Sequence, residues 1–335
     1  SFSSNHNFSK GFFYVADGTF NFYDTEKKTA YQDCYASLNA GKTLGIGNYD
    51  SANIIHSNGK FYLLVGTSTS NRDHFYIVDA KTLYYENSAV VGANLSGLTI
   101  LNEQYGLVTG DGIRRIDLKS LNNVRIKNER LLCFYNSIIY NGKVLSNDTY
   151  KDESKVKYYD VNELIAAKEG EAPAVTELDI IQKQKINFVL AKDGNVYTLE
   201  SADNGCNIVK IKNDFTLEKV FANFQPAKGP YHSSPTIGMV ASETENIIYL
   251  VSTDGAIYKY ILGDSDSLKA PFIAAESGVS ITAPLQLNQQ SGELYVTYTE
   301  ERKDESKIVV YSKDGKVLHT VDCGESVPSQ ILFNN

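Results

Sequence analysis

One stretch of the sequence has the residue types and spacing of a phosphate-binding motif. Residues 36–43 read ASLNAGKT, and Gly41, Lys42 and Thr43 satisfy the loose form of the nucleotide-binding P-loop. Further along, HFYIVD (residues 74–79) resembles the apolar strand whose last aspartate holds magnesium in such enzymes. A P-loop must open a helix, because the helix N-terminus and the loop N–H groups hold the phosphates. LGIGNYD follows instead, without helical periodicity, so the sequence argues against a nucleotide site.

Other catalytic arrangements find little support in the spacing. The five histidines are scattered, and no two stand at the spacing of metal ligands. YHSSP (residues 231–235) offers a histidine and two serines but no third residue that would orient the base. The sequence contains neither a G-x-S-x-G elbow nor an EF-hand loop. We therefore predict no catalytic residue, no metal and no cofactor, and leave open whether a metal binds where loops from separate segments converge.

The amino-acid composition limits which kinds of binding partner the protein can have. The 335 residues carry a net charge of −8, whereas proteins that neutralise nucleic-acid phosphates need clustered lysine and arginine, so we predict no nucleic-acid partner. No run of about 18 apolar residues predicts a transmembrane helix. The start, SFSSNHNFSKGFF, is typical of a mature or trimmed chain, and we expect any export signal to have been removed. Widely spaced cysteines favour free thiols, although disulfides stay open for an exported protein: Cys34, Cys133, Cys206 and Cys323.

The elements that must position any site are strands. Twenty-three tyrosines and no tryptophan favour sheet, and helical periodicity is confined to residues 161–171. Paired runs recur, such as NGKFYLLVGT with HFYIVDAKTL and SGELYVTYTE with SKIVVYSKDG. Each pair is flanked by a weaker run on either side, which gives four strands at a period of about 40 to 55 residues. This pattern predicts an all-β fold, a β-propeller with four antiparallel strands per blade.

Counting the repeats predicts seven blades. Six are contiguous, at about Asp50–Gly92, Asn94–Asn128, Arg130–Ile180, Gln182–Asn223, Pro230–Ser277 and Gly278–Gly324. Residues 11–34 supply only three strands, and SQILFNN (residues 329–335) supplies a further first strand. Pairing these two fragments closes the ring and leaves no exposed sheet edge. We therefore predict an N-terminal tail at residues 1–10 and a single propeller domain at residues 11–335.

A ligand is expected where long loops gather. The connections between second and third strands, and between the fourth strand and the next blade, are long and polar in several blades, whereas those at the opposite ends are short. Long loops need a functional reason, so the long-loop ends favour binding. Aromatic side chains there would supply contact area, and charged ones would fix ligand orientation. The candidate ligand-binding residues are Tyr49, Asp50, Arg72, Asp73, Tyr150, Tyr231, His232 and Arg302.

One family resemblance supports this fold. The segments GFFYVADGTFNFYD, NAGKTLGIGNYD, NGKFYLLVG and HFYIVDAKTL resemble the YncE-like surface propellers of Bacteroidetes that carry a DUF5074-type domain. The resemblance implies a seven-bladed propeller exported as a lipoprotein to the outer-membrane surface, with a lipid anchor absent from this chain. It also implies capture of a nutrient, cobalamin in the best understood case, for a TonB-dependent transporter. The chain departs from that pattern in lacking tryptophan and in the insertion STSNRDH.

Three functions are compatible with these features. The favoured one is a non-enzymatic binding protein that captures a small-molecule nutrient, cobalamin-like or other, or a glycan for a transporter. The alternatives are a protein–protein interaction scaffold and a propeller enzyme of lactonase or lyase type with a metal or acid/base site at the channel mouth. An exposed apolar patch would favour the scaffold, and converging carboxylate or histidine side chains would favour the enzyme.

Overall fold

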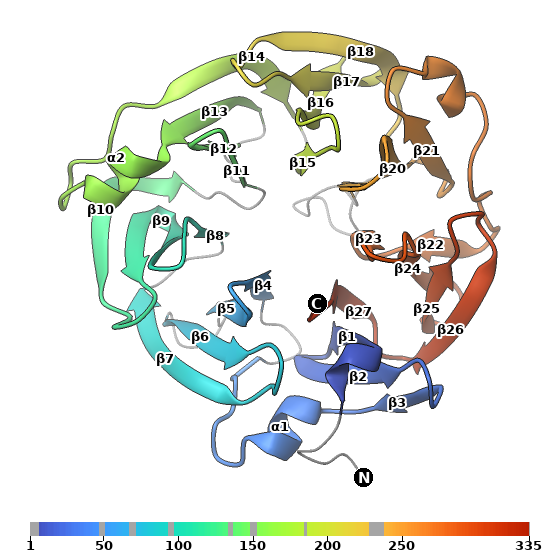
Figure 1. Ribbon diagram of the computed structural model, residues 1–335, viewed down its shortest axis with the longest axis horizontal. Helices are drawn as coiled ribbons and strands as arrows, with labels where there is room; N and C mark the ends of the chain where they lie inside the picture. Colours follow the sequence, from blue (N-terminus) through green and yellow to red (C-terminus); the bar gives the residue numbers. More distant parts are fainter. Residues whose placement is uncertain are drawn as a thin grey trace. The chain divides into compact units, whose positions relative to one another are not determined.

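A computed structural model describes residues 7–46, 51–66, 72–92, 97–132, 137–147, 153–183, 186–227 and 238–334. The chain divides into two compact units. The first comprises Ser1–Lys151, Val156–Glu177 and Leu332–Asn335, and the second comprises Asp152–Lys155 and Leu178–Ile331. The strands of the described residues form seven small antiparallel sheets, which confirms the predicted seven-bladed β-propeller (Figure 1).

Four sheets belong mainly to the first unit. The first has the order β27-β1-β2-β3, so the C-terminal strand pairs with the N-terminal blade as predicted. Its strands are β27 (Pro328–Leu332), β1 (Gly11–Ala16), β2 (Thr19–Asp24) and β3 (Thr29–Tyr31). The second contains β4 (Ser51–Ser57), β5 (Lys60–Gly66), β6 (Asp73–Asp79) and β7 (Tyr85–Gly92). The third contains β8 (Gly97–Ile100), β9 (Tyr105–Asp117) and β10 (Asn123–Leu132), and the fourth β11 (Ile138–Tyr140), β12 (Lys143–Ser146), β13 (Ser154–Asp160) and β14 (Thr176–Gln182).

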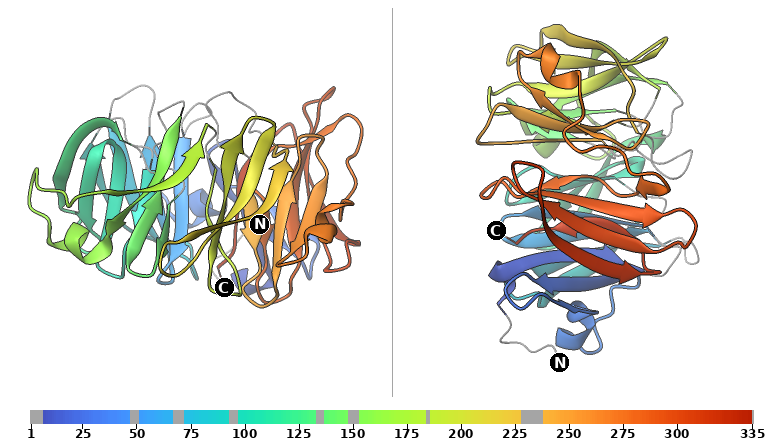
Figure 2. Two further views of the ribbon diagram at one scale, coloured as in Figure 1. Left: turned by 90° about the horizontal axis from the view of Figure 1, so that it is seen from above. Right: turned by 90° about the vertical axis from the view of Figure 1, so that its right-hand side faces the viewer.

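Three sheets lie in the second unit. The fifth sheet contains β15 (Val189–Leu190), β16 (Val196–Ala202), β17 (Gly205–Ile211) and β18 (Leu217–Phe224). The sixth contains β19 (Met239–Ala241), β20 (Ile247–Val251) and β21 (Ile257–Ile261). The seventh contains β22 (Val279–Ile281), β23 (Gln286–Leu287), β24 (Leu294–Glu300), β25 (Ser306–Tyr311) and β26 (Val317–Gly324). In the last of these, β22 and β23 both pair with β24. Figure 2 shows its red strands side by side as one twisted sheet.

The third sheet has four strand segments although β9 counts as one strand. A straight strand of its length would span about 40 Å. Leu118 N nevertheless donates to Gln104 O at 2.8 Å, so the two ends of β9 lie next to each other. Gly110 (φ 145°) and Gly112 (φ 81°) stand in the middle, where the chain must reverse. β9 is therefore a hairpin that supplies the second and third strands of its blade.

Burial follows the position of a strand within its sheet. Inner strands such as β1 and β5 are buried almost throughout, whereas the outer strands β7, β18 and β26 have one buried residue each and are otherwise exposed or half-buried. A strand covered on both faces needs a nearly continuous apolar run, which is what GFFYVA and KFYLLVG provide. The core of the first unit includes an aromatic cluster in which Phe13 of β1 and Phe61 of β5 make an edge-to-face contact at 5.7 Å between ring centroids.

Helical segments are few and short in the described residues. They are η1 (Phe8–Lys10), α1 (Cys34–Leu38), α2 (Val161–Ala166) and η2 (Ser265–Leu268). α2 confirms the one helix predicted from periodicity. Phe8, which the sequence places in an N-terminal tail, is buried with its ring 4.8 Å from that of Phe13. No helix in the described part of the chain is long and apolar enough to cross a membrane.

A repeated aspartate ends the third strand in four blades. The Oδ1 atoms of Asp24, Asp79 and Asp117 each accept hydrogen bonds at 2.9 Å from the N–H groups two and three residues ahead. The fourth, Asp160, caps α2 by accepting from Glu163 N at 2.9 Å. A carboxylate that satisfies two unpaired N–H groups stabilises the turn. Asp79, the aspartate of HFYIVD, therefore closes a turn. This role explains the residue without a magnesium ion or a nucleotide.

We expect Asp79→Ala to lower the free energy of unfolding by about 1 kcal/mol at neutral pH, because two N–H groups lose their acceptor. Asp79→Asn keeps an acceptor oxygen and should cost less. Burial raises the pKa of Asp79, but hydrogen bonds from Thr82 and Lys81 and the Lys60 ammonium more than offset it, so the pKa is lowered. Its contribution is then present above the unfolded pKa of about 3.9 and is lost as pH falls through the folded pKa.

Urea unfolding at about pH 7 and about pH 3 checks this linkage. The wild type should lose more stability on acidification than Asp79→Asn, since asparagine does not titrate. Identical losses would show that this carboxylate does not contribute to acid sensitivity.

Candidate functional site

The eight candidate ligand residues fall into two groups. Five of them lie outside the described residues: Tyr49, Asp50, Tyr150, Tyr231 and His232. Arg72 is exposed immediately before β6, and Asp73, the first residue of β6, is only 3% exposed. Arg302 is exposed in the turn between β24 and β25. Arg72 and Asp73 thus belong to the first unit and Arg302 to the second, and none of the three lines the pockets described below.

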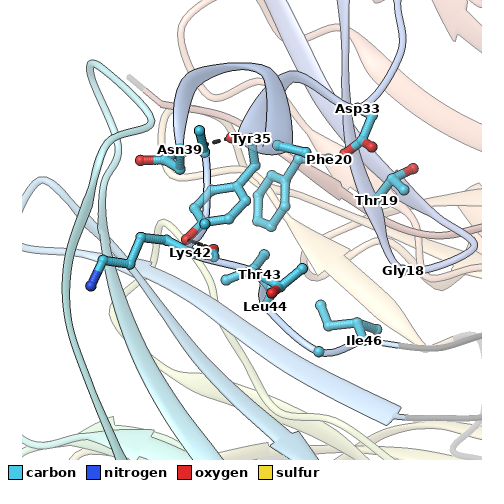
Figure 3. Close-up of a pocket in the computed structure, with 14 residues that line it drawn as sticks. Gly18, Thr19, Phe20, Asp33, Tyr35, Asn39, Lys42, Thr43, Leu44 and Ile46 are labelled. Carbon is cyan, nitrogen blue, oxygen red and sulfur yellow. Dashed lines mark hydrogen bonds between the residues drawn. The ribbon is translucent and has the colours of Figure 1, made fainter.

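A preformed pocket lies instead at the long-loop end of the first sheet. It has a volume of about 280 Å³ and is enclosed by the β1–β2 turn, the start of β2 and the connection from β3 towards β4 (Figure 3). We call it the AGKT pocket, after the stretch that forms one wall. Its lining residues are Gly18, Thr19, Phe20, Asp33, Tyr35, Ala36, Asn39, Ala40, Gly41, Lys42, Thr43, Leu44, Gly45 and Ile46.

One wall is held by Tyr35 and Asn39. The Tyr35 hydroxyl donates to Lys42 O at 2.7 Å, which ties α1 to the following loop. Asn39 Nδ2 donates at 2.9 Å to both Tyr35 O and Leu83 O, while Asn39 Oδ1 accepts from Tyr85 N at 2.8 Å. One side chain thus fastens the loop to the second sheet. A wall fixed in this way loses little conformational entropy when a ligand binds.

The opposite wall is held by Asn21, which is 1% exposed. Its Oδ1 accepts from Asp33 N at 2.9 Å. The Thr19 hydroxyl lies 3.2 Å from the same oxygen, and its shorter hydrogen bond goes to Ala16 O at 2.8 Å. Asp33 adopts a left-handed conformation (φ 51°) immediately before α1. Such backbone costs energy in a residue other than glycine and persists where the surroundings impose it. Asn21 therefore fixes the backbone at Asp33, a residue that lines the pocket.

The lining determines which ligands are acceptable. Figure 3 shows the Phe20 and Tyr35 rings and Thr43 around the space, with Asp33 and Thr19 at one side. The Lys42 side chain runs away from Thr43, and its Nζ lies 4.9 Å from the centre of the Tyr85 ring. Asp33 and Lys42 are the charged residues among those that line the pocket. With the Lys42 ammonium placed over Tyr85, the Asp33 carboxylate disfavours binding of a phosphate. α1 also ends at Leu38, before Gly41, so its N-terminus is not available to the GKT segment.

The groups at the pocket are poorly suited to nucleophilic chemistry. Burial raises the pKa of the neighbouring Cys34 thiol to about 12, so the reactive thiolate is scarce at neutral pH. Burial, with Tyr76 and Tyr85 nearby, raises the pKa of Tyr35 to about 12 as well. Within the described ranges, no group of three or more His, Cys, Asp or Glu side chains is placed to hold a metal ion.

The fold identifies the structural class of the protein, and similarity in sequence identifies its family. Seven small antiparallel sheets make this chain a seven-bladed β-propeller. A family model described as "Domain of unknown function (DUF5074)" matches residues 8–334, and the chain belongs to that family. None of the curated proteins searched matches it.

Solved structures show the same fold at low identity. A functionally unknown protein from Desulfotomaculum acetoxidans DSM 771 is similar with a TM-score of 0.59 and 13% identity, over 97% of this chain and 99% of that one. Kluyveromyces lactis Hsv2 is similar with a TM-score of 0.50 and 11% identity, over 99% and 98% of the two chains. At such identities the likeness extends to the fold alone.

The pocket and two of the sequence-based candidates belong to the same loop, LNAGKTLGIGNYD, but to different parts of it. Tyr49 and Asp50 stand at the far end of this loop. The pocket forms around the earlier part of this loop and adds Thr19, Asp33 and Thr43. The glycines at Gly18, Gly41 and Gly45, all with positive φ, were the available signal that the backbone turns sharply there.

Proposed function

We propose that the chain is a non-enzymatic binding protein that captures a small uncharged or cationic organic molecule in the AGKT pocket. The observation that carries the proposal is a preformed pocket whose two walls are fixed by Tyr35, Asn39 and Asn21. Its volume of about 280 Å³ suits a molecule smaller than a typical drug-sized ligand. A corrinoid is far larger, so the ligand of this pocket would differ from cobalamin.

The resemblance to surface propellers supports a proposal for the cellular location of the protein. We extend the proposal to display on the outer membrane through a lipid anchor and to delivery of the ligand to a TonB-dependent transporter. What supports this extension is the likeness of the N-terminal blades to those lipoproteins. A pull-down from outer membranes with the ligand-loaded protein tests it, and recovery of no transporter would leave ligand capture without this partner.

A thermal-shift screen tests capture directly. The panel should contain sugars, polyols, amines, corrinoids, haem, siderophores and divalent metals. A ligand at 100 times its dissociation constant should add about 2.7 kcal/mol of stability, which is an easily measured shift. A shift with a small organic compound supports capture, whereas a shift with metal alone favours the enzyme alternative. No shift across the panel contradicts the proposal and favours the interaction scaffold.

Ala36→Trp is expected to fill the pocket and abolish the ligand-induced shift. Ala36 is exposed on α1 and lines the pocket, whereas its neighbour Ser37 is exposed and does not. Ser37→Trp is therefore the matched control and should retain binding. The chain has no tryptophan, so each variant carries a single indole. The indole of Ala36→Trp should emit at shorter wavelength and be less accessible to acrylamide than that of Ser37→Trp; equal accessibility would show that the pocket is not formed.

A further inference from the structure

A second ligand-sized space lies in the second unit, between the outer strand β18 and the neighbouring sheet. This groove has a volume of about 500 Å³. Phe221 and Phe224 of β18 and Tyr258 of β21 form its apolar part, and Asn223, Gln225 and Asp254 contribute polar groups. It shares no residue with the AGKT pocket. Figure 1 labels β18, β20 and β21, which carry it.

A β-bulge places the two phenylalanines on the same side. In a regular strand Phe221 and Phe224 would point to opposite faces, because they are three residues apart. Here Ile208 pairs with Phe221 and Cys206 pairs with Phe224, so β18 has one residue more than β17 between these pairs. Asn223 takes the left-handed conformation (φ 64°) within the bulge. Bulges that re-aim side chains in this way are frequent at binding sites.

The aromatic surface is partly open. Phe224 is buried at 6% exposure, with its ring edge-to-face to Tyr258 at 5.9 Å between centroids. Phe221 and Tyr258 are half-buried and pack on the hydrophobic core of this unit. The two half-buried rings can therefore offer apolar surface to a ligand, and Phe224 packs against the Tyr258 ring.

The polar rim is fixed by the backbone. Thr253 N donates to Gln225 O at 2.8 Å, and the Thr253 hydroxyl donates to Pro226 O at 3.0 Å, which joins the end of β18 to the β20–β21 turn. In that turn, Asp254 Oδ1 accepts from the Ser252 hydroxyl and from Ala256 N. These two bonds lower the pKa of Asp254, so the carboxylate stays ionised. Both use Oδ1, which leaves Oδ2 as an acceptor for a ligand.

We infer that this groove binds a neutral saccharide of roughly two pyranose rings. A pyranose has an apolar C–H face that suits the Phe221 and Tyr258 rings and a rim of hydroxyls that suits a carboxylate and two amides. Asp254 would repel an acidic ligand, and a purely apolar ligand would offer no hydrogen bond to Asp254 Oδ2 or to the Asn223 side chain. The inference does not depend on the AGKT pocket.

Saturation-transfer NMR with the full chain tests the inference. The probes are cellobiose, maltose, mannobiose, xylobiose and chitobiose, with digalacturonic acid as an acidic comparison. We expect at least one neutral disaccharide to receive saturation, most strongly at its C–H protons, and digalacturonic acid to receive none. Absence of transfer to every neutral probe, or stronger transfer to digalacturonic acid, overturns the inference.

Amino-acid substitutions in the groove test whether the saccharide binds there. Asp254→Asn should weaken affinity roughly tenfold through loss of a charged acceptor, while keeping the turn bonded. Tyr258→Ala should weaken it by roughly fivefold or more. Asp203→Asn is the matched control, because Asp203 is exposed in the corresponding turn of the preceding blade and does not line the groove. Ala36→Trp should leave affinity unchanged. Equal affinities of Asp254→Asn and Asp203→Asn in folded protein overturn the assignment to this groove.

Discussion

Replacing Phe61 with alanine is expected to lower the free energy of unfolding by about 3–5 kcal/mol. Phe61 is fully buried, and its ring lies 5.7 Å from that of Phe13, 5.9 Å from that of Phe20 and 5.3 Å from that of His56, measured between centroids. Removing it loses the transfer free energy of the ring and leaves a cavity between two sheets of the first unit that rigid strands cannot close.

The same substitution should weaken ligand binding in the AGKT pocket, because Phe20 lines that pocket and rests on Phe61. Urea unfolding followed by circular dichroism measures the stability loss. Tyr84→Ala is the control: Tyr84 is 41% exposed near the same sheet, and its loss should change stability by less than about 0.5 kcal/mol. Similar losses for the two variants would contradict the importance of the aromatic cluster.

The sheets were predictable because their signals are local. NGKFYLLVG combines an Asn-Gly turn with an apolar run, and the structure has Asn58 and Gly59 at φ 54° and 70° before β5. α2 was predictable from the helical periodicity of residues 161–171, and in the structure Asp160 caps its first turn. Seven repetitions of such signals, together with unmatched fragments at the two termini, were enough to predict the propeller and its closing strand.

The candidate sites were less predictable because contacts distant in sequence build them. Asn39 acts through Leu83 and Tyr85, which lie more than forty positions further on. No local sequence pattern predicts these hydrogen bonds, because an asparagine in a polar loop is normally expected to be exposed to solvent. At the groove beside β18, strand alternation places Phe224 on the wrong side, because one bulge residue, Asn223, reverses the side to which the following side chain points.

Gly18→Ala is expected to have the second-largest effect, about 2–5 kcal/mol. Asp17 and Gly18 form the β1–β2 turn with φ values of 49° and 74°. A Cβ on Gly18 would clash with the carbonyl oxygen of Ile46 and lie 3.1 Å from the Ile46 Cβ. The substitution therefore adds an unfavourable left-handed alanine to a steric conflict with the loop that encloses the AGKT pocket.

Gly59→Ala separates these two contributions. Gly59 occupies the equivalent position in the Asn58–Gly59 turn, with φ 70°, and a Cβ there would meet nothing within 4 Å. It should cost only the conformational part, about 1–2 kcal/mol, and leave ligand binding intact. The excess loss in Gly18→Ala, measured by urea unfolding, then reports the contact between the turn and Ile46. Equal losses of stability in the two variants would mean that the loop at Ile46 moves aside without an energetic penalty. The wall of the AGKT pocket formed by that loop would then not be preorganised.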